Sequence, residues 1–220
     1  MSFIEVKHIN KTFKVPVKSS GRFSTLKSFF NRKYNYIKAI NDISFSIKKG
    51  EIVGYIGPNG AGKSTTIKIL SGILTPDNGE VIINRMIPWK DRKKYVSNIG
   101  VVFGQRSQLW WDIPAIDSFN LLKDIYKLDD SEYQRTLNEL INLLNLKDII
   151  NIPVRQLSLG NRMKCEIAAS LLHKPKILFL DEPTIGLDAV SKKIVREFIK
   201  KINNSTNSLN VFTYSLLSNL

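Results

Sequence analysis

The residues best suited to do chemistry form the stretch Gly57-Pro58-Asn59-Gly60-Ala61-Gly62-Lys63-Ser64-Thr65, which fits the pattern G-x-x-x-x-G-K-[ST]. Its glycines permit a tight curl in which successive backbone N–H groups point inward at an anion, and a following helix would add its positive N-terminal dipole. Lys63 can reach the β- and γ-phosphates of a nucleotide, and the Ser64 hydroxyl can ligate Mg²⁺. The stretch therefore predicts a phosphate-binding loop rather than an ordinary glycine-rich turn.

A second candidate for chemistry is the acid pair Asp181 and Glu182, which follows the apolar run Ile177-Leu178-Phe179-Leu180. Such a run is typical of a central parallel strand covered on both faces, and open α/β sheets bind ligands at the carboxyl ends of their strands. There Asp181 can hold the Mg²⁺ that bridges the phosphates, and Glu182 can polarise an attacking water as a general base. Paired acids at a strand end are also often helix caps or surface groups. The phosphate loop upstream in the chain is what favours a catalytic role for this pair over those alternatives.

The hydrophobic pattern supplies the elements that must position these residues. Apolar residues at 52–56 predict a buried strand that enters the phosphate loop, and residues 65–70 predict the helix that leaves it. We predict further strands over 3–9, 40–47, 80–83, 99–103 and 210–214. We also predict helical stretches over 118–149 and 191–202, and a helix that the segment 157–162 leads into and that runs through 172.

The length of 220 residues fits one domain with a helical insertion. We expect an α/β core over 1–104 and 175–220, and a helical subdomain over 105–174. Proline, glycine, serine and many cations over 14–38 indicate an exposed basic loop, with one short basic helix around 25–30.

Composition limits the class of protein. The apolar fraction of 43% is ample for a packed core. No uncharged apolar run approaches the ~18 residues of a membrane-spanning helix, and no secretory leader precedes the fold. We therefore expect a soluble chain, and any contact with a membrane would be made through a partner protein. The single Cys165 lies among small apolar residues, which favours a core position in a reducing compartment.

The charge is strongly basic, with a formal net charge of +14, and residues 1–38 contain nine Lys or Arg and one acid, Glu5. Solvated surface charge is the first interpretation, and contact with anionic lipid on the cytoplasmic side is the second. Nucleic acid ranks third and is not expected as a partner, because the aromatic residues form no recognisable base-stacking module.

Together with two further segments, these motifs resemble the nucleotide-binding ATPase subunit of an ATP-binding-cassette (ABC) transporter. In all, four segments carry the resemblance: the loop 57–65, Gln105, Leu157-Ser158-Leu159-Gly160-Asn161-Arg162, and 177–182 with Gly186-Leu187-Asp188. The phosphate loop alone is shared by many ATPases and GTPases. The L-S-x-G segment, which precedes the apolar strand ending in Asp-Glu, is what makes the resemblance specific to the ABC family. It implies an α/β P-loop NTPase core with a mainly parallel sheet, an N-terminal antiparallel β part and a helical signature subdomain.

The resemblance also implies ATP and Mg²⁺ as cofactors. Phe13 resembles the aromatic residue that stacks on adenine, although Tyr34 and Tyr36 compete with it and a core position is the alternative for all three. Gln105 resembles the glutamine that contacts Mg²⁺ and the attacking water. The implied nucleotide contacts are Asn59, Gly60, Ala61, Gly62, Lys63, Ser64 and Thr65; the implied metal ligands are Ser64, Gln105 and Asp181; the implied catalytic residues are Glu182, Gln105 and Lys63.

Ser158 and Gly160 resemble the signature that contacts the γ-phosphate of ATP held on an opposite subunit, and Asp188 resembles the aspartate that links the two sites. The resemblance thus implies a homo- or heterodimer around ATP and an integral membrane permease as a further partner, on the inner, cytoplasmic face of the cell membrane. Residues 105–122, with Trp110-Trp111-Asp112-Ile113-Pro114, resemble exporter subunits of the ABC-2 type, which pair with separate membrane chains.

One position departs from the family pattern. The family places a histidine after the strand that follows the catalytic one, and Ser215 stands there in this chain, while His8 and His173 match no such place. Serine can hydrogen-bond a phosphate but lacks the charge and reach of histidine. We therefore expect normal ATP binding and slowed hydrolysis. The chain also stops without the family's closing strands, so a truncated or sequence-disrupted product is a further expectation.

Two alternatives remain beside an ATP-hydrolysing exporter subunit. A binding-only subunit would close on ATP but hydrolyse it very slowly; Glu182 favours the enzyme and Ser215 favours this alternative. The second alternative is a soluble ABC protein that acts on DNA or ribosomes. Such relatives usually carry a long coiled-coil insertion or a second cassette, and this sequence has neither.

Overall fold

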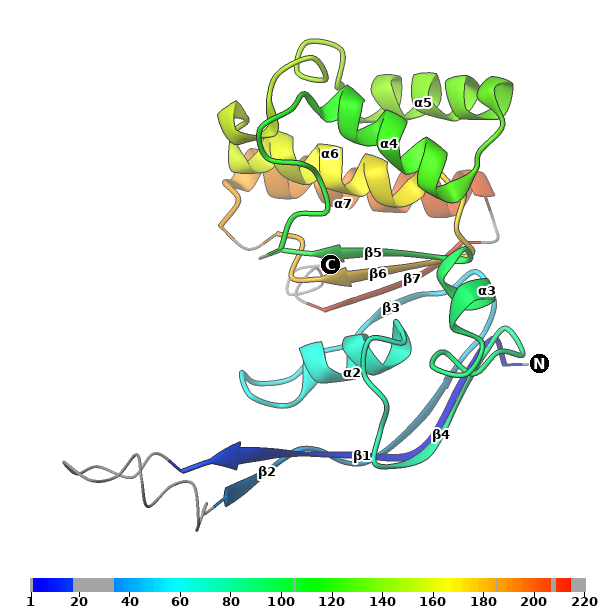
Figure 1. The fold of residues 1–220 in the computed structure, drawn as a ribbon, viewed down its shortest axis with the longest axis vertical. Helices are drawn as coiled ribbons and strands as arrows, with labels where there is room; N and C mark the ends of the chain where they lie inside the picture. Colours follow the sequence, from blue (N-terminus) through cyan, green and yellow to red (C-terminus); the bar gives the residue numbers. More distant parts are fainter. Residues whose placement is uncertain (1, 18–33, 105, 185, 207–208, 215–220) are drawn as a thin grey trace, which may run out of the picture.

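The computed structural model describes residues 2–17, 34–104, 106–184, 186–206 and 209–214. Its centre is a parallel sheet with helices on both faces, and an antiparallel sheet lies beyond the helix on one of these faces (Figure 1). The parallel sheet has the order β3-β7-β6-β5 and consists of β3 (Ile52–Gly54), β7 (Asn210–Tyr214), β6 (Ile177–Asp181) and β5 (Ile99–Phe103). These strands confirm the mainly parallel α/β core that the apolar runs predicted.

Strand β6 lies in the middle of this sheet and separates two hydrophobic cores. Its successive side chains point to opposite faces, as in any strand. Ile177 and Phe179 join the core on the side of α2 (Lys63–Leu70). Leu178 and Leu180 join the core on the side of α6 (Leu159–Leu171) and α7 (Ala189–Thr206). The run is apolar throughout because both of its faces are covered.

The antiparallel sheet has the order β2-β1-β4 and consists of β1 (Ile4–Pro16), β2 (Tyr34–Ile47) and β4 (Asn78–Ile83). Strands β1 and β2 form a hairpin that remains paired as far as Pro16 and Tyr34. The prediction of a loop over 14–38 is therefore wrong at both ends, where ladder hydrogen bonds outweigh the loop-like composition. The middle of that range, including the basic helix expected around 25–30, lies outside the described residues.

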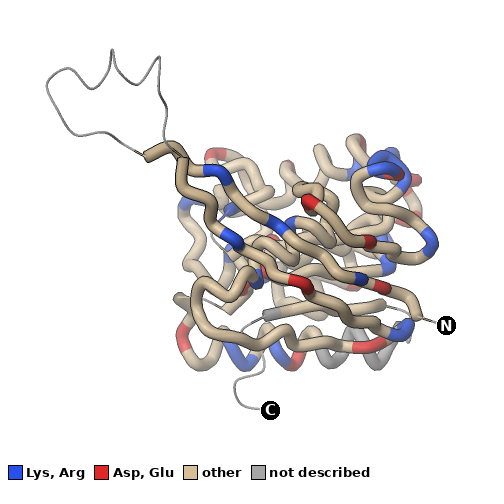
Figure 2. The backbone as a smooth tube through the Cα atoms, turned by 90° about the horizontal axis from the view of Figure 1, so that it is seen from below, with Lys and Arg blue, Asp and Glu red and all other residues tan. Residues whose placement is uncertain are grey.

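Basic positions recur along this hairpin, with acidic positions between them (Figure 2). Two of the lysines on β1 have acidic partners: Lys7 Nζ lies 2.9 Å from a carboxylate oxygen of Glu5, and Lys11 Nζ lies 2.8 Å from one of Asp77. These pairs are consistent with solvated surface charge at this part of the hairpin.

The helical part begins with α4 (Ala115–Tyr126), which starts three residues before the stretch 118–149 predicted as helical, and α5 (Asp130–Leu144), which lies inside it. Asp129 caps α5, since its carboxylate accepts hydrogen bonds from the N–H groups of Ser131 at 2.9 Å and Glu132 at 3.2 Å. A short helix α3 (Arg92–Val96) precedes β5 and a 3₁₀ turn η1 (Val154–Gln156) precedes α6; the sequence analysis predicted neither. None of the helices in the described ranges combines the length and apolar character that a membrane span requires.

His173 joins three elements just beyond the end of α6. Its ring stacks on that of Tyr126 with a centroid distance of 4.0 Å, and its Nε2 lies 2.8 Å from the carbonyl oxygen of Ile99 on β5. Because a carbonyl only accepts, Nε2 carries the proton of the neutral ring. The Nδ1 atom is buried and has no hydrogen-bond partner among the residues that the structure describes. Burial lowers the pKa of this histidine below 6.5, against a smaller opposing effect of the bond to Ile99.

This geometry predicts an acid-sensitive fold. Because the pKa of His173 is lower in the folded than in the unfolded chain, protonation below about pH 6.5 favours unfolding. A His173→Gln variant keeps an amide donor for Ile99 but cannot titrate. Its free energy of unfolding should therefore fall less than that of the unaltered protein between pH 7.5 and 5.5, as measured by urea denaturation. An equal fall in both proteins would contradict the prediction.

Candidate active site

The phosphate loop connects β3 to α2. Gly60 and Gly62 have φ angles of 82° and 80°, in the left-handed region that favours glycine. Gly62 is the N-cap of α2 and, as a glycine, makes no side-chain capping hydrogen bond, so the N-terminus of the helix adjoins the loop. Lys63 is 8% exposed and its Nζ donates to the carbonyl oxygens of Gly57 at 2.8 Å and Pro58 at 2.7 Å. The loop thus places a lysine and a helix N-terminus at one spot, as an anion site requires.

A hollow of about 420 Å³ lies between this loop and the hairpin, lined by Ile37, Lys38, Ala39, Asn59, Gly60, Gly62, Lys63, Ser64, Thr65 and Glu182. Of the residues expected to contact ATP, the loop members other than Ala61 line this hollow. Phe13 lies opposite Ile37 in the hairpin but does not line the hollow, and neither do Tyr34 and Tyr36. Ile37, which is 54% exposed, is the large apolar residue that borders it. Base stacking on Phe13 stays a prediction.

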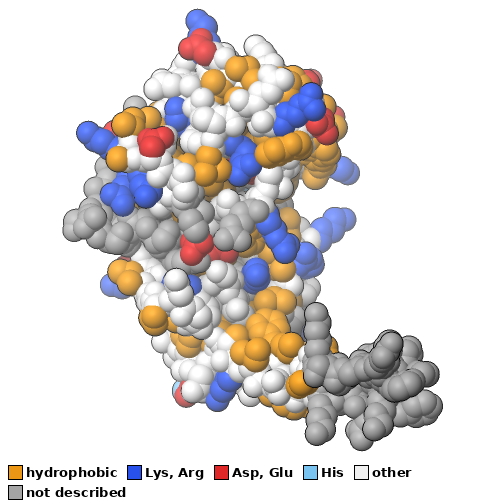
Figure 3. Space-filling model, turned by 90° about the vertical axis from the view of Figure 1, so that its left-hand side faces the viewer, with side chains coloured by type: hydrophobic (Ala, Val, Ile, Leu, Met, Phe, Trp, Pro, Cys, Tyr) orange, Lys and Arg blue, Asp and Glu red, His pale blue; other side chains and the backbone are white. Residues whose placement is uncertain are grey.

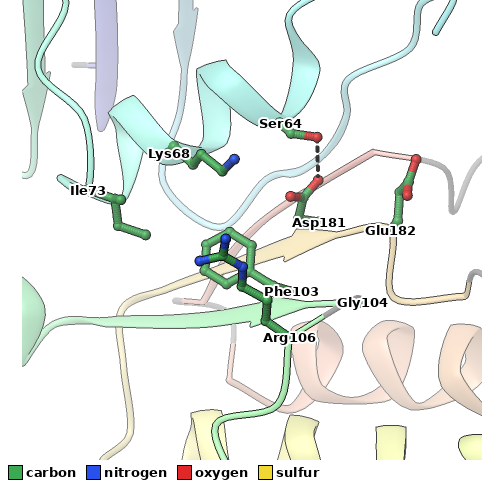
Figure 4. Close-up of a pocket in the computed structure, with 8 residues that line it drawn as sticks. All are labelled: Ser64, Lys68, Ile73, Phe103, Gly104, Arg106, Asp181 and Glu182. Carbon is green, nitrogen blue, oxygen red and sulfur yellow. Dashed lines mark hydrogen bonds between the residues drawn. The ribbon is translucent and has the colours of Figure 1, made fainter. Parts of the chain in front are cut away.

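The acid pair stands beside the loop at the carboxyl end of β6. Ser64 Oγ donates a hydrogen bond of 3.1 Å to Asp181 Oδ1, and Figure 4 shows these two side chains pointing toward one another with Glu182 alongside. Glu182 has a φ angle of 55°, so its backbone is held in an uncommon conformation for a residue with a side chain. Ser64 and Glu182 line the hollow above and also a second cleft of about 240 Å³.

This second cleft brings the end of β5 against the acids. The Gly104 N–H donates to the Asp181 carbonyl oxygen at 2.8 Å, and a Cβ at Gly104 would lie 2.4 Å from the Glu182 carbonyl oxygen. Only glycine permits this approach. The cleft is lined by Ser64, Lys68, Ile73, Phe103, Gly104, Arg106, Asp181 and Glu182. Gln105 lies outside the described residues, between two that line the cleft.

The residues present fit a magnesium nucleotide. Mg²⁺ prefers oxygen ligands and is usually held by one or two protein groups together with phosphate oxygens and water. Ser64 and Asp181 provide a hydroxyl and a carboxylate at hydrogen-bond distance, next to the phosphate loop. The described residues contain no group of three or more His, Cys, Asp or Glu side chains suited to hold a metal without phosphates.

The signature residues lie elsewhere, at the start of α6. Ser158 is the N-cap of this helix and its Oγ accepts from the Asn161 N–H at 3.2 Å. A Cβ at Gly160 would lie 2.4 Å from Ser191 Oγ, so the helix packs closely on the start of α7. Asp188 accepts hydrogen bonds from the N–H and hydroxyl of Ser191, at 2.8 and 3.0 Å, which lower the pKa of its carboxyl. The Leu159–Gly160 segment and Asp188 therefore form one packed unit.

This unit does not share the hollows of the phosphate loop. Neither Ser158 nor Gly160 lines them. Helix α6 lies on the face of the parallel sheet opposite to α2 (Figure 1). On the side toward which the parallel strands point, acidic side chains gather at the waist between the helical part and the sheets, with Lys and Arg side chains beside them (Figure 3).

Sequence reasoning missed several described residues that line the site, and three of them show why. Lys68 follows Ser64 by one helical turn, so its spacing could have indicated the same helix face. Arg106 is the neighbour of Gln105 and could have been included with it. Ile37 had no local signal, because only the pairing of β1 with β2 brings it to the loop.

Comparison with known proteins agrees with this geometry. Residues 40–185 match the family model described as ABC transporter. The ABC transporter ATP-binding protein NatA of Bacillus subtilis is 33% identical over 180 residues, which are 82% of this chain and 73% of that protein. The linearmycin resistance ATP-binding protein LnrL of Bacillus subtilis is 33% identical over 174 residues, 79% of this chain but only 56% of LnrL.

Among solved structures, the dimeric ATP-binding cassette MJ0796 bound to ADP and Pi superposes with a TM-score of 0.76 at 26% identity, covering 96% of this chain and 88% of that one. The chain thus spans most of this cassette and little more than half of a longer relative such as LnrL.

The two left-handed glycines give a matched test of the loop. Alanine at either position costs about 1 kcal/mol in backbone strain. At Gly60 the added Cβ meets no atom of the described residues within 4 Å, whereas at Gly62 it would lie 2.1 Å from the Ala39 carbonyl oxygen on β2. We expect Gly62→Ala to lower the free energy of unfolding clearly more than Gly60→Ala in denaturant titrations without nucleotide. Equal losses would show that the loop does not rest on β2.

Proposed function

This chain belongs to the family of ABC transporter ATP-binding proteins, and from that premise we propose that it binds and hydrolyses MgATP as the ATPase subunit of an exporter. Members of this family are ATP hydrolases. What we propose beyond this family property is which residues act in this chain, that it forms a dimer, that it pairs with a permease and that the transport is export.

The observation that carries the proposal is the meeting of three groups at one edge of the sheet. The lysine of the phosphate loop, the Ser64–Asp181 pair and Glu182 come from α2 and the end of β6 and line adjoining hollows. Such a combination supports phosphoryl transfer to water, where catalysis consists of positioning and charge stabilisation.

Each residue then has a distinct task. The loop N–H groups and Lys63 hold the β- and γ-phosphates in place of water. Ser64 and Asp181 would hold Mg²⁺, which would neutralise negative charge on the phosphates. Glu182 orients the attacking water and accepts its proton. Gln105, as the resemblance implies, would complete the contacts to the metal and this water.

We propose that the signature acts on a second copy or a related subunit. Ser158 and Gly160 belong to a unit on the far face of the sheet, which suits contact with a γ-phosphate held by another chain. Because that phosphate would touch both subunits only in the closed dimer, ATP shifts the population toward closure, and hydrolysis removes the difference. Asp188, beside the signature, would join the two sites.

The permease and the direction of transport rest on resemblance. Trp110 and Trp111, in the segment that resembles exporter subunits, are 44% and 49% exposed on the helical part. Arg162 lies over the Trp111 ring, 5.4 Å from its centroid. An exposed aromatic pair supports docking to another protein. A place at the inner face of the cell membrane, through that permease, follows from the proposal.

A binding-only subunit is the second candidate, favoured by serine at position 215 in place of the family histidine. That residue lies outside the described part of the chain, so the argument is one of sequence. Both candidates bind ATP and close a dimer; they differ in turnover.

Glu182→Gln tests the proposed chemistry. The amide keeps the shape but cannot accept the proton, so steady-state phosphate release should fall by about 10²–10⁴-fold while ATP still binds. The variant should also accumulate as an ATP-dependent dimer in size-exclusion chromatography. Lys63→Ala is the matched contrast, because it should lose ATP affinity and dimer together. Unchanged hydrolysis by Glu182→Gln would exclude Glu182 as the base.

Ser215→His tests the second candidate. If the missing imidazole limits turnover, histidine should raise kcat about tenfold or more and leave the KM for ATP little changed, as expected for a group that acts on the transition state. Phosphate release over a range of ATP concentrations measures both constants. No gain in kcat would remove the reason to regard the protein as hydrolysis-impaired.

A further inference from the structure

Glu166 is a buried acid in the helical part to which the proposed chemistry assigns no task. It lies in the middle of α6 and is 3% exposed. Its carboxylate accepts a short hydrogen bond from the Ser107 hydroxyl and one of 3.1 Å from the Gln108 N–H. The Gln108 side-chain amide in turn donates to the Glu166 carbonyl oxygen at 2.8 Å. One residue of α6 thus holds two consecutive residues of the segment that follows β5.

The burial of this carboxylate explains why the segment stays in place. Burial raises the pKa of Glu166, and the hydrogen bonds from Ser107 and Gln108 and the charge of Arg162 oppose that rise. A buried acceptor that loses its partners is strongly unfavourable. Movement of residues 107–109 away from α6 would separate the carboxylate from its donors Ser107, Gln108 and Leu109, so the segment and the helix should move together.

The segment connects two parts of the proposed mechanism. Ser107 follows Gln105 by two residues in the chain, and Glu166 follows the signature Ser158 by eight residues, about 12 Å along the helix. Farther along, the Trp110 N–H donates to the Ser118 hydroxyl of α4 at 3.1 Å. The stretch 107–110 is therefore attached to the signature helix by Glu166 and to its neighbour by Ser118.

We propose that Glu166 is a positioning residue for ATP hydrolysis: it fixes the segment after Gln105 to the signature helix, so that engagement of the signature by an opposite nucleotide also sets the segment beside the chain's own acids. This inference rests on the proposed ATPase function and adds the connection between its two sites. Glu166 itself touches no substrate and acts only through residues 107–109.

Glu166→Met tests the connection, because methionine fills a similar volume but accepts no strong hydrogen bond from Ser107 or Gln108. We expect the KM for ATP and the affinity for a fluorescent ATP analogue to stay within about twofold, since the phosphate loop is untouched, while kcat falls roughly ten- to hundredfold through misplacement. Glu166→Gln is the rescuing variant. Its carbonyl oxygen can accept from Gln108 and its amide can donate to Ser107, so kcat should recover to within about threefold.

Two further variants control the test. Glu139→Met makes the same change at an exposed glutamate of α5 and should leave both constants unaltered. Ser107→Ala removes one donor of the contact from the other side, lowers kcat in the same direction, and adds little when combined with Glu166→Met, because the two residues form one unit. Ser107→Ala also serves where Glu166→Met fails to fold.

The outcomes separate the two proposals. Loss of kcat with KM preserved, recovery in Glu166→Gln and non-additivity with Ser107→Ala support the connection. Wild-type kcat in Glu166→Met, parallel loss of ATP affinity and melting temperature, or no recovery with glutamine would overturn it and leave the ATPase function standing. Failure of the unaltered protein to bind or hydrolyse ATP would overturn the proposed function, and this inference with it.

Discussion

The hydrogen bond from Ser64 to Asp181 joins residues that lie 117 positions apart, and the geometry of the site depends on it. Ser64 is placed by the start of α2, and Asp181 by the end of β6. The two meet only because the sheet is parallel and β6 runs through its middle, so that its carboxyl end opens beside the phosphate loop. The side chains of β6, which pack alternately into the cores on the two faces of the sheet, are therefore as necessary to the site as the motif residues themselves.

The same alternation divides the molecule into parts with different tasks. The core on the α2 side supports the loop and the antiparallel sheet, whereas the core on the other side supports the signature helix. A signature placed there is separated from its own loop by the sheet. This division gives a physical reason for a nucleotide site shared between two chains. Each chain would supply the phosphate loop for one nucleotide and the signature for another.

Much of this was readable from the sequence, where the signal was local. The phosphate loop needs particular residues at fixed spacing, and Ile177–Leu180 is too continuously apolar for a surface element, so both were predicted with their neighbours. The ends of the hairpin were not, because Lys14 and Tyr36 have loop-like surroundings and are strand only through pairing across the hairpin. Ile37 and Glu166 were missed for the same reason: their places depend on residues far away in the chain.

The segment after β5 links the two cores over a short distance. On the sheet side, Gly104 is anchored by its N–H to the Asp181 carbonyl oxygen. On the helix side, Ser107 and Gln108 are anchored to Glu166. Only two residues, 105 and 106, connect these anchors, so any displacement of the helical layer against the sheet must be taken up next to Asp181 and Glu182. Under the proposed function, a movement of the signature helix would therefore act on Arg106, which lines the cleft together with Asp181 and Glu182.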